Sequence, residues 1–280
     1  MVTTSPGHRA GPDDVFQRSN DVRPMQPRPS AMRHVRLHSR PLHHGLRATL
    51  AALAVATFGL LGLQSARAAE PAGVPDTIEQ RVAACIACHG RQGSTGNAAF
   101  FPRLAGKPAG YLFNQLRSFR DGRRSNTDMN YMVRHMSDAY LQEIADYFAG
   151  LDLPYAAVSP TSDAAPAQLA RGRQLALEGD AARRIPACVH CHGAALTGVQ
   201  PAIPGLLGLP RLYVSSQLGA WLTNERHALA PDCMAEIGGR MTTADINAVA
   251  SWLAVQPMPA NPKPVSAPAA PLPMACGGMQ

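Results

Sequence analysis

Two stretches of the chain carry apolar residues at the spacing of an amphipathic helix. Residues 141–148 and 246–253 each hold apolar side chains at positions i, i+3, i+4 and i+7. Ser137 stands where an N-cap precedes the first stretch, and Thr242-Thr-Ala-Asp245 has the form of a capping box before the second. Both stretches are therefore predicted to be helices that bury one face.

Each predicted helix is the last element of a sequence unit that occurs twice in the chain. Cys85-Ile-Ala-Cys88-His89-Gly90 returns as Cys188-Val-His-Cys191-His192-Gly193, at an offset of 103 residues. The further matches are Phe101-Pro102 with Ile203-Pro204, Tyr111 with Tyr213, Gln115-Leu116 with Gln217-Leu218, Met129 with Met234 and Met136 with Met241. Repetition at this spacing indicates a duplicated module.

We therefore predict an all-α protein with two tandem domains, residues 69–152 and 167–256, joined by a linker at 153–166. Aromatic residues make up only 5% of the chain, so a flat apolar cofactor in each core would supply the missing bulk. Residues 257–280 hold seven prolines and almost no apolar periodicity. This composition predicts a disordered tail.

Residues 1–68 have the composition of an export leader. They hold nine of the 26 Lys and Arg residues but three of the 19 acids, so the basic charge belongs to the leader and does not indicate nucleic-acid binding. The apolar stretch of 16 residues at 48–63, which includes two Gly and two Thr, falls short of the roughly 20 residues that span a bilayer, which disfavours a retained anchor. The pattern Ala66-Arg67-Ala68 predicts cleavage of a signal peptide before Ala69, with translation starting at Met1 or at Met32.

Cys-x-x-Cys-His is the attachment signature of c-type haem. The two thiols form thioethers to the haem vinyl groups, and the adjacent histidine becomes the proximal iron ligand. The motif predicts two covalent haems, with Cys85, Cys88, Cys188 and Cys191 binding the cofactors and with His89 and His192 binding the irons. A zinc site and a thioredoxin-like redox pair are the alternatives.

The sixth iron ligand separates a carrier from a catalyst, because methionine raises the potential and closes the iron to substrate. Met129 and Met234 keep the register of the repeat and are expected in loops before the last helix of each unit. They are therefore the predicted ligands. The competing side chains are Met132, Met136 and Met241, with His135 and His227 as bis-histidine alternatives.

A proximal histidine needs an acceptor for its Nδ1–H. Pro102 and Pro204 follow their histidines by 13 and 12 residues, in loops that can turn a carbonyl toward the ring. The arginines considered as partners of the haem propionates in the first unit are Arg103, Arg117, Arg120, Arg123 and Arg124.

Cys233 and Cys276 lie outside the haem motifs. In an exported protein two spare thiols favour a disulfide, which would pin the tail beside Met234. Free thiols, and a Cys233 thiolate that binds iron in place of methionine, are the alternatives. The thiolate would favour an enzyme.

Between residues 75 and 256 the chain resembles the cytochrome c4 family of dihaem class I cytochromes. The shared motifs are Cys-x-x-Cys-His-Gly, Phe-Pro-x-Leu-Ala-Gly, Tyr-Leu-x-x-Gln-Leu and a Met followed by Met-Ser-Asp before the final helix. The second unit departs from the first at Gly205 and Leu209, which replace Arg103 and Lys107.

The resemblance implies two tandem class I cytochrome c-like domains, each built around one covalent haem c. It assigns Cys85, Cys88, His89 and Met129 to the first haem and Cys188, Cys191, His192 and Met234 to the second. It also implies a carrier of electrons between respiratory complexes in the periplasm of a Gram-negative bacterium.

The predicted function is the shuttling of single electrons between a donor and an acceptor redox protein, with no substrate turned over. Nucleic acid and stable membrane insertion after signal cleavage are not expected. The alternatives are a dihaem enzyme of the thiosulfate-oxidising or peroxidase kind, and a cytochrome subunit of a dehydrogenase or oxidase complex.

Overall fold

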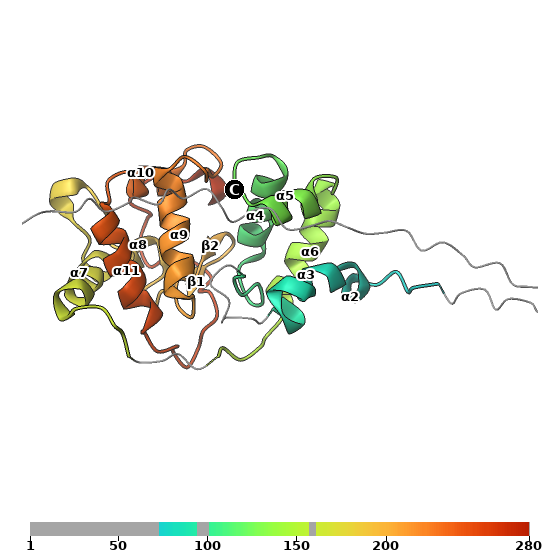
Figure 1. The fold of residues 1–280 in the computed structure, drawn as a ribbon, viewed down its shortest axis with the longest axis horizontal. Coiled ribbons are helices and arrows are strands. Elements are labelled where there is room, and N and C mark those ends of the chain that lie inside the picture. Colours follow the sequence, from blue (N-terminus) through green and yellow to red (C-terminus); the bar gives the residue numbers. More distant parts are fainter. Residues whose placement is uncertain (1–72, 94–100, 157–160, 280) are drawn as a thin grey trace, which may run out of the picture. The chain divides into compact units, whose positions relative to one another are not determined.

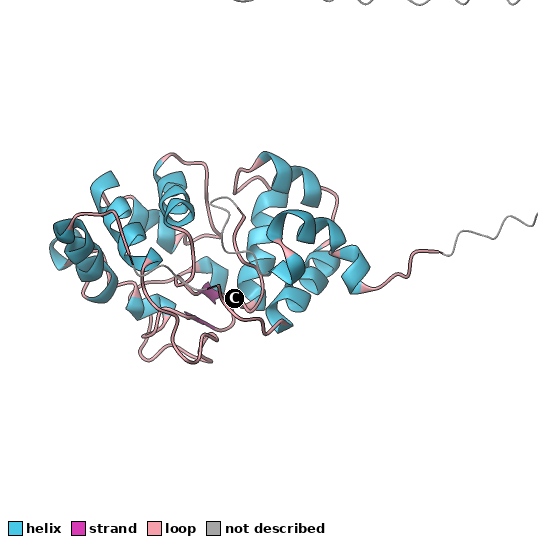
Figure 2. Cartoon of the chain, turned by 60° about the horizontal axis from the view of Figure 1, so that its bottom comes forward, coloured by secondary structure: helices cyan, strands magenta, loops and turns pink. Residues whose placement is uncertain are grey.

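The structure, a computed structural model, describes residues 73–93, 101–156 and 161–279. The predicted leader, its cleavage site and both candidate start positions lie outside these residues. The regular structure is helical (Figures 1 and 2) except for one antiparallel hairpin, β1 (Gly198–Val199) with β2 (Ile203–Pro204). The all-α prediction is confirmed. The hairpin was not predicted, because strands of two residues are too short to show an alternation of apolar and polar positions.

The elements follow in two series. The first module holds α2 (Ile78–Arg81), α3 (Ala83–His89), the 3-10 turn η1 (Arg91–Gly93), α4 (Ala109–Arg120), α5 (Thr127–Val133) and α6 (Asp138–Gly150). The second module holds α7 (Pro166–Leu177), η2 (Ala181–Arg183), α8 (Val189–His192), the hairpin, α9 (Arg211–Leu222), α10 (Cys233–Gly238) and α11 (Thr243–Ala254), and η3 (Gly277–Met279) follows in the tail.

The predicted last helix of the first module is α6. The Ser137 hydroxyl accepts the backbone N–H of Tyr140 at 3.2 Å and begins the helix as expected. Its apolar stripe is buried and packs against α4. The residues of the stripe are Leu141, Ile144, Ala145 and Phe148.

The corresponding helix of the second module is α11. The predicted capping box is present, since the Thr242 hydroxyl accepts the Asp245 N–H and the Asp245 carboxylate accepts the Thr242 N–H. Helix α11 packs against α7 at Gly172, where an added Cβ would lie 2.1 Å from the Ala248 carbonyl oxygen. The approach of the two helices therefore requires glycine at this position.

A closed set of ion pairs joins α7, η2 and α11. Arg171 contacts Asp180 at 2.8 Å and Asp245 at 2.9 Å, and Arg183 contacts the same two carboxylates at 2.9 and 2.7 Å. Burial alone would raise the pKa of Asp245, but hydrogen bonds from Arg183, Thr242 and Arg171 hold it well below its usual range. The same arginines lower the pKa of Asp180.

This network makes the second module sensitive to acid. The pKa of an aspartate in an unfolded chain is about 3.9, and the pKa of Asp245 in the folded protein is lower. The stabilisation is therefore complete above about pH 4 and is lost as the pH falls through the folded pKa. We expect the melting temperature to fall steeply below about pH 4 in thermal scans followed by circular dichroism.

The matched control is Asp245→Asn. At pH 6 it should be destabilised by about 3 kcal/mol, because it leaves two arginines without one of their carboxylates. It should also have a shallower acid transition than the parent. Identical acid profiles for parent and variant would exclude the network as the cause.

Residues 257–279 are not the disordered tail that their composition predicts. The backbone N–H of Val265 donates to Gly198 at 3.0 Å, and the N–H of Gln200 donates to Val265 at 2.8 Å. Near its end the tail is joined to α10 by a disulfide between Cys233 and Cys276. These bonds hold the segment without an apolar core, and its prolines reduce the chain entropy lost on ordering.

The two modules contact each other through equivalent residues. The N–H of Ser125 donates to the Glu225 carbonyl at 3.0 Å, and the N–H of His227 donates to the Arg123 carbonyl at 2.6 Å. Ser125 and His227 occupy the same position of the repeat, as do Arg123 and Glu225. The same loop of both copies therefore contributes to the junction.

Candidate haem sites

Three of the four motif cysteines are neutral thiols. Burial raises the pKa of Cys85 and Cys191 and raises the pKa of Cys188 to about 11. None of these cysteines, Cys88 included, forms a disulfide. A redox pair requires a lowered thiol pKa, and within the described ranges no three His, Cys, Asp or Glu side chains are grouped to hold a metal ion. The thiols fit thioether attachment better than zinc or redox chemistry.

Both motif histidines are held in one orientation by a proline carbonyl. His89 ends α3 and its Nδ1 lies 2.9 Å from the Pro102 oxygen, and the Nδ1 of His192 lies 2.7 Å from the Pro204 oxygen. Because a carbonyl only accepts, Nδ1 carries the proton and Nε2 keeps its lone pair for a metal. The predicted roles of the two prolines are confirmed. Burial lowers the pKa of each histidine, which favours the neutral ring that binds iron.

The first cavity is an apolar space of about 900 Å³ in the first module. Cys85, Cys88 and His89 line it, and so does Met129. The volume lies within the roughly 300–1,000 Å³ that is usual for cofactor sites. The competing methionines Met132 and Met136 also line this cavity.

The second cavity has a volume of about 220 Å³ in the second module. Cys188, Cys191 and His192 line it, together with methionines from α10, from the loop before α11 and from the tail. These methionines are Met234, Met241 and Met279. Sequence reasoning missed Met279, because the disulfide brings it to the cavity from 45 residues beyond Met234. The bis-histidine alternatives His135 and His227 line neither cavity.

Met129 and Met234 do not lie in loops as predicted. Each stands in the first turn of a short helix, α5 or α10. The Asn126 side chain accepts the Met129 N–H at 3.0 Å, and the Asp232 side chain accepts the Ala235 N–H at 3.0 Å. These N-caps begin helices too short for an apolar period to be visible in the sequence.

Two buried arginines meet where the modules join. Arg124 and Arg226 are 8% and 6% exposed, and both donate to the carboxamide oxygens of Gln115 and Gln217. In the described part of the chain neither guanidinium has a carboxylate partner. Burial, together with the positive charge of Arg124, lowers the pKa of Arg226 to about 10.

Buried cations without an anion are costly, so these side chains fit the propionate groups of haem. Arg124 lines the first cavity and Arg226 lines both. Arg226 was missed in the sequence, although it matches Arg124 at the offset of 102 that relates Gln115 to Gln217.

The other candidate arginines have partners already. Arg120 pairs with Asp121 and Asp138, and Arg123 pairs with Asp121. Arg103 is buried but donates to the carbonyls of Ala105, Leu153 and Pro154. Arg117 lies 3.8 Å from Asp138. Among the described residues, Arg103 and Arg124 therefore both line the first cavity without a carboxylate partner, and Arg124 is the one that meets Arg226 where the modules join.

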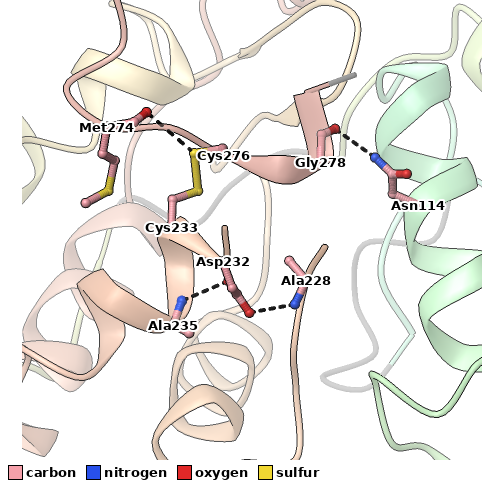
Figure 3. Close-up of a disulfide and its surroundings, with 8 residues drawn as sticks. All are labelled: Asn114, Ala228, Asp232, Cys233, Ala235, Met274, Cys276 and Gly278. Atoms are coloured by element: carbon pink, nitrogen blue, oxygen red, sulfur yellow. Dashed lines mark hydrogen bonds between the residues drawn. A yellow bond between two sulfur atoms is a disulfide. The ribbon is translucent and has the colours of Figure 1, made fainter. Parts of the chain in front are cut away.

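The disulfide between Cys233 and Cys276 confirms the predicted pairing (Figure 3). Their Cα atoms are 5.2 Å apart, a normal separation for a disulfide. The Cys233 sulfur is therefore bonded to the tail and is not a thiolate beside Met234. Both tail residues Cys276 and Met279 line the second cavity.

Twice in one helical chain, a Cys-x-x-Cys-His motif lines an apolar cavity together with methionine, and this arrangement defines a dihaem c-type cytochrome. No family model matches the chain. It is 32% identical over 199 residues to cytochrome c4 of Pseudomonas aeruginosa, covering 70% of this chain and 93% of that protein. The chain belongs to the cytochrome c4 family.

A second relative has a more specific name. The chain is 41% identical over 206 residues to the thiosulfate dehydrogenase electron acceptor of Thiomonas intermedia, covering 74% of this chain and 91% of that protein. The predicted resemblance is confirmed, and the protein is an electron-transfer protein with two covalently bound haem c groups.

Solved structures agree with this fold. Reduced cytochrome c4 from Pseudomonas stutzeri matches with a TM-score of 0.54 and 28% identity, covering 62% of this chain and 94% of that chain. The thiosulfate dehydrogenase of Marichromatium purpuratum matches with a TM-score of 0.55 and 33% identity over 62% of this chain. The match covers only 36% of that longer protein.

Proposed function

We propose that this protein is a periplasmic carrier that takes single electrons from a thiosulfate-oxidising dehydrogenase and passes them to a second redox protein. The relative from Thiomonas, 41% identical to this chain, bears the name of such an acceptor. The export signature before Ala69 supports the location. In the portion that the structure describes, every helix is too short or too polar to cross a bilayer.

The observation that carries the proposal is the pairing of side chains in each cavity. Each cavity is lined by a histidine whose Nδ1–H donates to a proline carbonyl. Methionines from another element line the same cavity. Histidine and methionine together close the iron to substrates and raise its potential. This pairing suits a carrier.

The residues proposed for each haem follow from this geometry. They are Cys85, Cys88, His89 and Met129 for the first haem, and Cys188, Cys191, His192 and Met234 for the second. Haem, when bound, supplies an iron that alternates between the ferrous and ferric states.

The protein orients the histidines, excludes water from the cavities and supplies positive charge. The proline carbonyls fix the tautomer of both histidines. The apolar walls exclude water, which keeps the local dielectric low. Arg124 and Arg226 offset the negative charge of propionates where the modules join.

Among the alternatives, the dihaem enzyme requires an iron with a displaceable or thiolate ligand. The disulfide removes Cys233 from consideration as that ligand. The loss of this thiolate, together with the pairing of histidine and methionine, favours the carrier over the enzyme.

The experiment mixes the purified, oxidised protein with thiosulfate, in the presence and absence of a purified thiosulfate dehydrogenase. We expect the haem absorption to change to the reduced spectrum only when the dehydrogenase is present, with up to two electrons taken per chain. Reduction by thiosulfate alone would identify an enzyme instead. No reduction in either mixture would exclude this donor.

A further inference from the structure

Large apolar side chains are exposed at the mouth of the first cavity. Phe101, Tyr131 and Met132 all line it and are 36%, 62% and 38% exposed. A side chain that both lines a cavity and faces solvent lies at its opening. Clustered exposed apolar groups of this kind mark interaction sites, whereas single ones do not.

The second cavity has no such rim. In the described residues of the second module and the tail, the exposed large apolar side chains are Leu212, Leu222 and Val265. None of them lines the second cavity. By the repeat, Glu236 takes the position of Tyr131, and it pairs with Arg240. The two openings are therefore chemically different.

The tail forms part of the wall of the second cavity. Residues 276–279 line it, and the disulfide holds them there (Figure 3). The Gly277 N–H donates to the Pro231 carbonyl at 2.9 Å, and the Gly278 carbonyl accepts from the Asn114 side chain at 2.8 Å. The tail is thus bonded to both modules beside the second cavity.

The first opening also carries unpaired negative charge. Asp128 and Glu225 line the cavity and are exposed, and neither has an ion-pair partner within the described ranges. The nearby Arg134 stacks on the Tyr131 ring at 3.9 Å and donates to His135, and its positive charge offsets one of these two carboxylates. Two free carboxylates beside an apolar surface suit a partner with basic side chains.

We propose that redox partners bind at the mouth of the first cavity, and that the partner presents an apolar surface flanked by lysine or arginine around its own cofactor. The inference rests on the carrier function proposed above and names the surface through which it operates. Electron transfer slows steeply with the distance between cofactors, so a partner docked on this apolar rim would exchange electrons with the first haem. The second haem would then exchange electrons with that partner through the first.

The test uses the complete dihaem protein, reduced, and follows its oxidation by a lysine-rich mitochondrial cytochrome c in a stopped-flow spectrophotometer. Tyr131→Ser should lower the second-order rate constant about tenfold, as expected for loss of a central aromatic contact. Asp128→Asn with Glu225→Gln should lower the rate at low salt and flatten its dependence on ionic strength. Leu212→Ser, an exposed apolar residue at neither cavity, is the matched control and should react like the parent.

Hexacyanoferrate(III) separates docking from the redox function itself. This small oxidant needs no docking surface, so Leu212→Ser should be oxidised by it at the parental rate, and the oxidation of Tyr131→Ser should be slowed far less with it than with the cytochrome. If Tyr131→Ser and the charge variant react with the cytochrome like the parent, or if Leu212→Ser slows equally, the proposed surface is wrong. Failure of both oxidants to reoxidise the parent would instead reject the carrier function.

Discussion

Replacing His89 by Ala yields a protein that carries one haem instead of two and loses much of the helical structure of its first module. Without its iron ligand the first haem is not held in place. The apolar walls of the first cavity, about 900 Å³ in volume, would then lose the group that fills them, and walls without packing partners collapse or unfold.

The second module provides a graded comparison. Its cavity is smaller, about 220 Å³, so less of its wall depends on a bound group for packing. His192→Ala should therefore also lose a haem but keep more residual structure than His89→Ala. Haem content is measured by the pyridine haemochrome and intact mass, and structure by far-ultraviolet circular dichroism.

His190 provides the control for both variants. It stands inside the second motif but is exposed, so His190→Ala should retain both haems and parental helicity. A His89→Ala protein with two stably bound haems would show that this histidine is not an iron ligand.

Replacing Met129 by Ala should remove the red-region methionine–iron absorption of one haem and lower the potential of that haem by a few tenths of a volt. The estimate lies within the roughly 0.8 V over which axial ligands tune haem potentials. The shift arises because the thioether favours ferrous iron over the water that replaces it. The measurements are optical spectra and a potentiometric titration, and the second haem serves as the internal reference.

The structure supports Met129 over its neighbour by burial. Met129 is half-buried and packs against the cluster of Phe119, Val133 and Leu141, whereas Met132 is 38% exposed. Met132→Ala should therefore leave both absorption bands intact. Loss of a band in Met132→Ala, with both bands kept in Met129→Ala, would reassign the ligand.

The sequence predicts well those features that strong periodicity or rigid chemistry determines. The final helix of each module is predictable, because four apolar residues and an N-cap agree on it, as at Ser137 and Thr242. The contacts of the two histidines were also predictable, since a ligating imidazole requires an acceptor and Pro102 and Pro204 recur at similar distances.

Features that depend on long-range contacts were not predictable in this way. Helices α5 and α10 are too short to display a period, so their methionines were assigned to loops. The order of the tail depends on backbone bonds to Gly198 and Gln200 in addition to the predicted disulfide. A proline-rich composition does not indicate which backbone groups a segment will bind.

The contacts between Arg124, Arg226, Gln115 and Gln217 have the form of an isologous interface inside a single polypeptide. Each arginine donates to the glutamine of its own module and to that of the other. Such reciprocity is the mark of a two-fold symmetric homodimer. The two modules are thus joined, inside one polypeptide, in the way that the subunits of such a dimer are joined. The disulfide-bonded tail breaks this symmetry, because it follows the second module.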